Sequence, residues 1–136
     1  MKKTIISILA SALIMFSLAG LFTGVLAKSF IEHNVDKTLL RLPPNLLMTF
    51  AGYFFLATLM ALTYQRFVKI VINPTKSGLI LGASFAVLWF MPYTLVLFSV
   101  YRFPYAALAI DLPWAFVEQG LGGLVIGLIQ GRRSQV

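Results

Sequence analysis

Four long apolar stretches restrict what this chain of 136 residues can fold into, and they cover approximately residues 4–27, 45–64, 77–100 and 104–130. A helix needs about 20 mainly apolar residues to cross a hydrocarbon core that is roughly 30 Å thick. Each stretch is long enough, and the first three contain no Lys, Arg, Asp or Glu. The sequence therefore predicts an all-α fold, a four-helix transmembrane bundle that forms one integral membrane domain over residues 1–136.

Composition excludes a water-soluble globule. Hydrophobic residues make up 60% of the chain and charged residues 11%, whereas soluble domains have about 45–50% apolar and about 25% charged residues. The net charge of +7 would suggest nucleic acid in a soluble protein. Here the basic residues lie between the apolar stretches, where lipid headgroups explain them. We therefore expect membrane lipid as a partner and no nucleic acid.

The distribution of basic residues predicts the orientation of the bundle. In an up-down topology with a cytoplasmic N-terminus, seven of the eleven basic residues lie on the inner side. An excess of Lys and Arg in cytoplasmic segments is typical of membrane proteins. We therefore expect both termini in the cytoplasm of a multi-pass protein of the cell (inner) membrane. The inner residues are Lys2, Lys3, Arg66, Lys69, Lys76, Arg132 and Arg133.

The first stretch has two interpretations. Its basic start and the Val25-Leu26-Ala27 sequence before Lys28 loosely resemble a secretory signal peptide and its cleavage site. However, its apolar run is longer than the roughly 7–15 residues of a signal-peptide core, and it contains the small residues Ser7, Ser11, Ser17, Gly20 and Gly24. Such residues let membrane helices approach one another. We expect a retained helix, and cleavage is the alternative.

Residues 28–44 have the pattern of a short amphipathic helix lying in the membrane interface, with apolar residues on one face and charges on the other. Pro43-Pro44 ends this pattern, and Asn45 is a candidate cap for the second span. Glu32, His33 and Asp36 suggest a metal site at first sight. His33 points away from the face that the two carboxylates share, so we interpret them as a solvated surface.

Glycine and proline predict how the spans pack. Gly78 and Gly82 at the start of the third span have the GxxxG spacing of close helix contacts. Gly120, Gly123 and Gly127 predict that the last half of the fourth span packs tightly on another helix. Pro92 predicts a kink in the third span. The short segment 101–104 predicts that the third and fourth spans form an antiparallel hairpin.

Asp111 and Glu118 are the only acidic residues inside an apolar stretch. An ionisable residue within a membrane span is costly and indicates a functional site. Asp111 precedes Leu112-Pro113, so we interpret it as the N-cap of a helix that begins near Leu112, with Arg102 as its partner. Its alternative role is in a polar site together with Glu118.

Glu118 lies about 18 Å from the inner interface by helical rise, at the level predicted for Ser17, Tyr53 and Trp89. No Lys or Arg is expected at this depth, so we expect a largely protonated side chain. Three interpretations stay open: a neutral carboxyl that hydrogen-bonds a neighbouring helix, a group that binds a ligand or handles a proton, and a group that faces a partner protein.

Enzymatic chemistry is not expected. The sole histidine is outside the spans, and the chain has neither cysteine nor a metalloprotease, nucleotide-binding or dinucleotide-binding motif. We therefore predict no catalytic residues, no metal site and no cofactor.

The segment from Pro92 to Arg132 resembles small uncharacterised four-helix integral membrane proteins of bacteria. The resemblance rests on Met91-Pro92, the 101–104 loop, Asp111, Trp114, Glu118, Gly122-Gly123 and Gly131-Arg132. It covers about the last third of the chain, and Gln130 departs from the pattern. Such proteins have no assigned activity, so the resemblance implies an inner-membrane bundle and no function.

From the residues, we expect a protein that binds or moves a small or lipid-like ligand at a polar site in the membrane. The ligand-binding residues of this site are predicted to be Glu118, Trp114, Asp111, Trp89 and Tyr93. The alternative is a non-catalytic subunit or assembly partner of a larger membrane complex. In either case the glycine faces could support a homo-oligomer.

Overall fold

The computed structural model of the chain describes residues 1–67 and 73–131, in which all regular structure is helical. The elements in order are α1 (Lys2–Leu21), the π-helix η1 (Phe22–Leu26), α2 (Lys28–Asn34), the 3-10 helix η2 (Lys37–Leu39), α3 (Leu46–Phe67), α4 (Pro74–Phe85), the π-helix η3 (Ala86–Phe90), α5 (Met91–Val100) and α6 (Tyr105–Gln130).

Four helical segments are long and apolar enough to cross a membrane: Lys2–Leu26, Leu46–Arg66, Pro74–Val100 and Tyr105–Gln130. They agree with the four predicted stretches to within a few residues. Their outer faces are apolar, and large side chains such as Phe55 and Leu88 are exposed on them. A bundle with so much exposed apolar surface is compatible with lipid as its surroundings.

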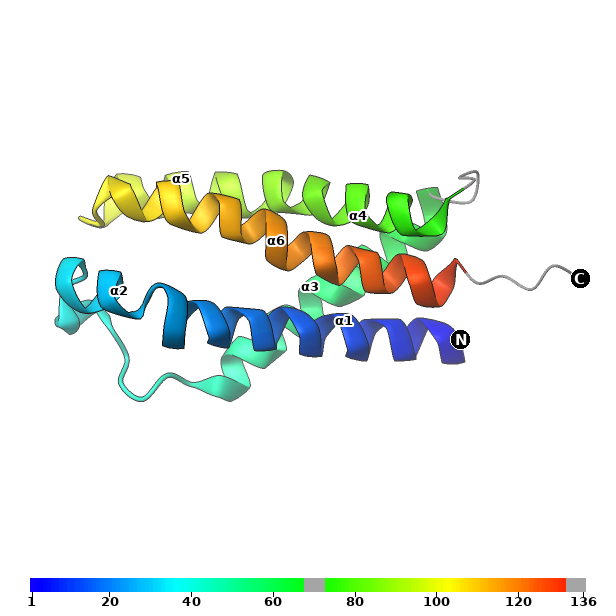
Figure 1. Cartoon of the computed structure of the whole chain (residues 1–136), viewed down its shortest axis with the longest axis horizontal. Coiled ribbons are helices and arrows are strands. Elements are labelled where there is room, and N and C mark those ends of the chain that lie inside the picture. The colour runs from blue at the N-terminus through cyan, green and yellow to red at the C-terminus, as the bar shows by residue number, and fades with distance from the viewer. Residues whose placement is uncertain (68–72, 132–136) are drawn as a thin grey trace, which may run out of the picture.

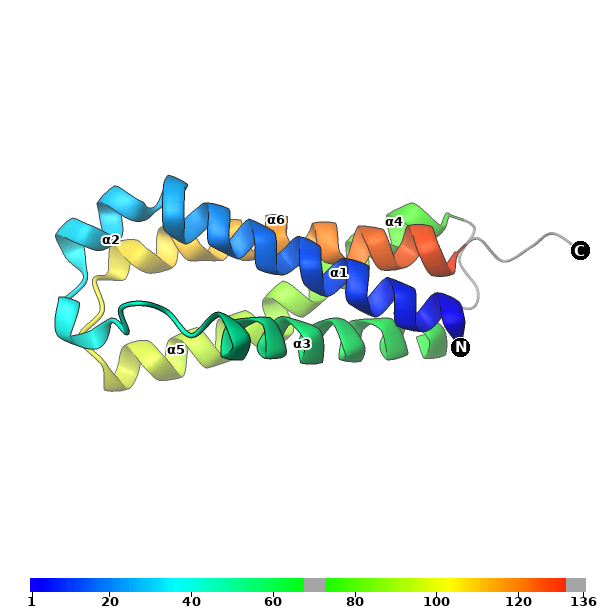
Figure 2. The ribbon, with the colours of Figure 1, turned by 90° about the horizontal axis from the view of Figure 1, so that it is seen from below.

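The helices lie side by side along one axis (Figure 1). The start of α1 and the end of α6 lie at the same end, here called the terminal end. The opposite end, with α2 and the 101–104 loop, is called the loop end. Helix α6 packs on both α4 and α1, and α3 packs mainly on α1. Helix α5 separates from α6 toward the loop end, as Figure 2 shows.

The contact between α4 and α6 is backbone against backbone. A Cβ atom on Gly82 would collide with the carbonyl oxygen of Gln119, and one on Gly78 would collide with that of Gly123. From the other side, a Cβ on Gly127 would collide with the carbonyl of Pro74. The two helices are therefore antiparallel and closer than any side chain permits, which confirms the tight packing predicted from the glycines.

Helix α1 packs on α6 through small polar residues. The Ser11 hydroxyl donates to the Gly122 carbonyl oxygen at 3.0 Å, and the Gln130 side-chain amide donates to the Ser7 hydroxyl at 2.7 Å. The prediction of small-residue contacts is confirmed for these two serines. It is wrong for Gly20 and Gly24, where an added Cβ would meet no atom within 4 Å.

The third span changes helix type where a kink was predicted. The π-helix η3 ends at Phe90, just before Pro92. Proline has no N–H to donate, so the regular ladder loses a hydrogen bond there, and a π-turn is a common way to accommodate the defect. As a result, the third span consists of α4, which packs on α6, and α5, which diverges from it.

The segment between the first two spans is less regular than expected. Helix α2 ends at Asn34, and only the short η2 follows before α3, so one amphipathic helix over 28–44 is wrong. Asp36 accepts hydrogen bonds from the Thr38 backbone and hydroxyl, and the backbone bond is the main cause that lowers the pKa of Asp36. Asn45 accepts from the Met48 N–H, which confirms it as a cap.

Replacement of Gly82 by alanine tests the α4–α6 contact. Gly82→Ala should lower the unfolding free energy by about 1–3 kcal/mol, the usual range for overpacking, because the new methyl group meets backbone that cannot rotate away. The matched control Gly20→Ala adds the same methyl group where nothing lies within 4 Å. Thermal unfolding in detergent should separate the two variants, and equal melting temperatures would contradict the contact.

Candidate functional site

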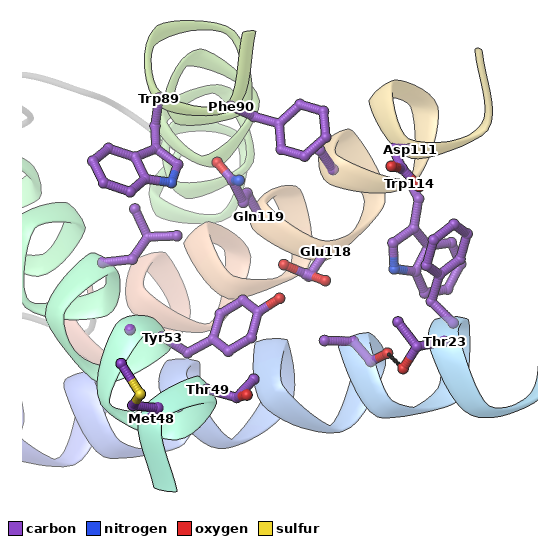
Figure 3. Close-up of a pocket in the computed structure, with 15 residues that line it drawn as sticks. Thr23, Met48, Thr49, Tyr53, Trp89, Phe90, Asp111, Trp114, Glu118 and Gln119 are labelled. Atoms are coloured by element: carbon purple, nitrogen blue, oxygen red, sulfur yellow. Dashed lines mark hydrogen bonds between the residues drawn. The ribbon is translucent and has the colours of Figure 1, made fainter. Parts of the chain in front are cut away.

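A cavity of about 370 Å³ lies among the four spans in the loop-end half of the bundle (Figure 3). Each span contributes to its wall, and Glu118 and Asp111 are its carboxylates. The remaining lining residues are Ala19, Phe22, Thr23, Met48, Thr49, Gly52, Tyr53, Leu56, Trp89, Phe90, Trp114, Ala115 and Gln119.

Helix α6 presents Glu118 to this cavity. Glu118 precedes Gly122 by one helical turn, so it shares the face of α6 that contacts α1. Its side chain is 6% exposed. Figure 3 shows the Tyr53 hydroxyl and the Trp114 indole nitrogen turned toward its carboxyl, and both groups interact with it. The carboxyl is thus removed from lipid and held among polar groups of two helices.

Two polar atoms at the cavity have no hydrogen-bond partner in the described part of the chain. They are the side-chain oxygen of Gln119 and the indole nitrogen of Trp114. The indole faces Glu118 without reaching hydrogen-bond geometry, and its ring stacks on Phe22 at 5.0 Å. Gln119 is 3% exposed. Buried polar atoms are almost always paired, so these two atoms are available to bond to an occupant of the cavity.

The N-cap interpretation of Asp111 is wrong. Helix α6 begins at Tyr105 with Pro104 as its cap, and it continues through Pro113. The missing N–H of Pro113 leaves only the Ala109 carbonyl without its regular partner, so the helix is not interrupted. No ion pair joins Asp111 to Arg102 within the described residues. Asp111 instead lines the cavity, two helical turns from Glu118.

The structure brings four of the five predicted site residues to the cavity: Glu118, Trp114, Asp111 and Trp89. Trp89 is nevertheless 49% exposed and contributes one edge of the wall. Tyr93 is not among the lining residues. It is 56% exposed and stacks on Trp89 with ring centroids 6.2 Å apart, because α5 diverges from α6.

Sequence reasoning missed Gln119 and identified Tyr53 only by its depth. A signal for Gln119 was present, since an amide beside Glu118 interrupts an otherwise apolar run. Phe22, Thr23 and Thr49 gave no such signal, because threonine and phenylalanine are ordinary residues of membrane helices. Ser17, predicted at the level of Glu118, bonds to the Leu13 carbonyl of its own helix and does not line the cavity.

The described residues contain no cluster of three His, Cys, Asp or Glu side chains that could hold a metal ion. Glu32 lies 4.0 Å from Lys28, His33 lies 2.7 Å from the Ser29 carbonyl oxygen, and Asp36 bonds to Thr38. These three side chains therefore have separate local partners on the surface.

In comparisons with known proteins, no family model, curated protein or solved structure matches this chain. The resemblance to small bacterial four-helix membrane proteins therefore stays a prediction, and function must be argued from the cavity.

Replacement of Gln119 by methionine tests whether its amide is unpaired. In purified, ligand-free protein, Gln119→Met should raise the unfolding free energy by about 1 kcal/mol, because an unsatisfied buried acceptor is removed at nearly constant shape. The control Gln65→Met removes the amide that donates to Thr4 and should lower stability. Thermal unfolding measures both changes. A loss of stability in Gln119→Met would show that the amide has a partner.

Proposed function

We propose that this protein binds a small ligand within the membrane, in the cavity lined by Glu118. The observation that carries the proposal is the cavity itself, with a buried carboxyl and an unpartnered amide oxygen in its wall. Its volume of about 370 Å³ lies within the roughly 300–1,000 Å³ typical of ligand pockets. Apolar walls with a few converging polar groups are also typical of such sites.

The cavity favours ligand binding over the two other interpretations of Glu118, a carboxyl that joins neighbouring helices and a group that faces a partner protein. A carboxyl that only joins helices would be expected in a solid interface, like that of Ser11 with Gly122. A carboxyl that docks a partner protein would be expected on the outer face of the bundle. Glu118 lies in neither place, since it is buried and lines an open volume. The proposal does not require catalysis, a metal or a cofactor.

We also propose an up-down topology in the cell (inner) membrane with both termini in the cytoplasm. The excess of basic residues predicted for that side supports this orientation. A fluorescent protein fused to the C-terminus should fold and fluoresce in bacterial cells, whereas alkaline phosphatase fused there should be inactive. Active phosphatase with a dark fluorescent fusion would reverse the orientation. A second pair of fusions after Arg102 should give the opposite pattern.

Tryptophan fluorescence can test cavity occupancy, because both tryptophans of the chain line the cavity. In a Trp89→Phe background, Trp114 should be quenched by bromobenzene in a saturable way, since the cavity is a finite binding site beside the indole. The additional change Gly52→Leu should remove the saturable part. Gly52 lines the cavity, and a Cβ there meets no atom within 4 Å, so a side chain at this position can begin without a clash and occupy part of the cavity.

The control is Gly20→Leu in the same background. Gly20 also has open space around it but does not line the cavity, so saturable quenching should be retained. Quenching by bromobenzene dissolved in the detergent rises linearly and should be equal in all variants. Linear quenching alone in the Trp89→Phe protein, or saturable quenching that survives Gly52→Leu, would overturn the proposed function.

A further inference from the structure

We propose that the ligand of this cavity is a small organic cation with an apolar body, such as a protonated amine or a quaternary ammonium ion. The inference rests on the proposed function and adds the chemical class of the ligand. It is carried by the juxtaposition of two carboxyls, several aromatic rings and an unpartnered amide oxygen around one cavity.

The charge of the wall has one sign. Asp111 and Glu118 line the cavity, and none of the lining residues from α1, η1, α3, η3 or α6 is Lys, Arg or His. A buried carboxylate without a counter-charge is very costly. The protein supplies no cation at this place, so a cationic ligand is the group that would complete the site. An anionic ligand would find no positively charged partner among the lining residues.

The aromatic residues add a second reason. Phe22, Tyr53, Trp89, Phe90 and Trp114 all line the cavity. Aromatic rings attract cations to their faces, and the attraction is strongest for desolvated quaternary ammonium groups beside tryptophan and tyrosine. Phe22 stacks on one face of Trp114 with an interplanar angle of 14°. The two stacked rings form one aromatic part of the cavity wall.

The unpartnered oxygen of Gln119 is an independent indication. It is an acceptor, its residue is only 3% exposed, and it lines the same cavity as Glu118. The N–H of a protonated amine would satisfy it, whereas a quaternary ammonium ion, which has no N–H, and a hydrocarbon ligand would not. A divalent metal fits less well, because the site has only two carboxylates and no cluster of three potential ligands.

Binding should exchange a proton for the cation. In the empty cavity Glu118 has no counter-charge, so the neutral acid is favoured over the carboxylate. When the cation enters, the carboxyl O–H bond breaks, the carboxylate pairs with the cation, and the proton leaves to solvent. Asp111 on α6 and Tyr53 on α3 are the other titratable groups at the cavity, and α1, η1 and η3 contribute none. Affinity should therefore rise with pH.

The test uses benzyltrimethylammonium and its neutral isostere neopentylbenzene, with purified protein in nanodiscs of phosphatidylglycerol. Calorimetry should show that the cation binds at least about tenfold more tightly than the isostere, since a desolvated cation–aromatic contact alone contributes roughly a factor of ten or more. Repeating the titration in buffers of different ionisation enthalpy should show proton release on binding.

Glu118→Gln should remove the preference for the cation and the proton release. The matched control is Glu32→Gln, which neutralises an exposed carboxylate paired with Lys28 on α2 and should leave both unchanged. Equal binding of the cation and its isostere, or a preference that survives Glu118→Gln in a folded variant, would overturn the inference. The bromobenzene experiment is independent of ligand charge, so the proposed function would stand in that case.

A lipid headgroup is the other source of an ammonium group. Without Lys or Arg in the cavity wall, its phosphate would have no partner, so we expect a free cation. Nanodiscs containing phosphatidylethanolamine should therefore give the same affinity for benzyltrimethylammonium as phosphatidylglycerol alone. Competition by phosphatidylethanolamine would contradict a free cation as the occupant.

Discussion

The backbone contact between α4 and α6 is the constraint on which the rest of the bundle depends. Lipid provides no hydrophobic drive for helices to associate, so close packing and hydrogen bonds must hold a membrane bundle together. The glycines at positions 78, 82, 123 and 127 allow this packing at the terminal end. Because η3 then redirects the chain, α5 cannot continue along α6. The glycine contact and the turn at η3 together divide the bundle into a solid half and a half with a cavity.

Polar side chains in the two halves of the bundle differ in their hydrogen-bond partners. In the solid half, the Ser11 hydroxyl bonds to the Gly122 carbonyl and the Gln130 amide N–H bonds to Ser7 across the α1–α6 contact, although the Gln130 side-chain oxygen has no partner in the described residues. In the cavity half, the Gln119 oxygen and the Trp114 nitrogen stay unpaired beside a buried carboxyl. Packing alone would favour apolar residues at these positions. Unpaired polar groups lower stability, and the convergence of these groups on one cavity supports the proposed ligand site.

The sequence predicts the spans well because span length and hydropathy depend only on the local chain and the thickness of the bilayer. It also singles out Glu118, because an acidic residue is rare in an apolar stretch, and the glycine contact, because the glycines recur at helical spacing. The sequence does not predict the positions of residues that depend on where helices begin and how they diverge. Asp111 has the local pattern of a cap, yet α6 begins earlier. Tyr93 shares the aromatic character of Trp89, yet the course of α5 removes it from the cavity. Neither outcome is encoded near the residue concerned.

The division into halves also limits what this conformation can do. In α1, α3 and α6 the lining residues lie nearer the loop end than Met15, Met60 and Ile126, which are fully buried. Met15 fills the space beside Gly122, where an added Cβ would lie 2.7 Å from its sulfur. A ligand could not cross this layer unless α1 moved away from α6 and the Ser11–Gly122 bond broke. On the proposed function this structure would be a binding state, and transport would require a second conformation in which the α1–α6 contact opens while the glycine contact of α6 with α4 is kept.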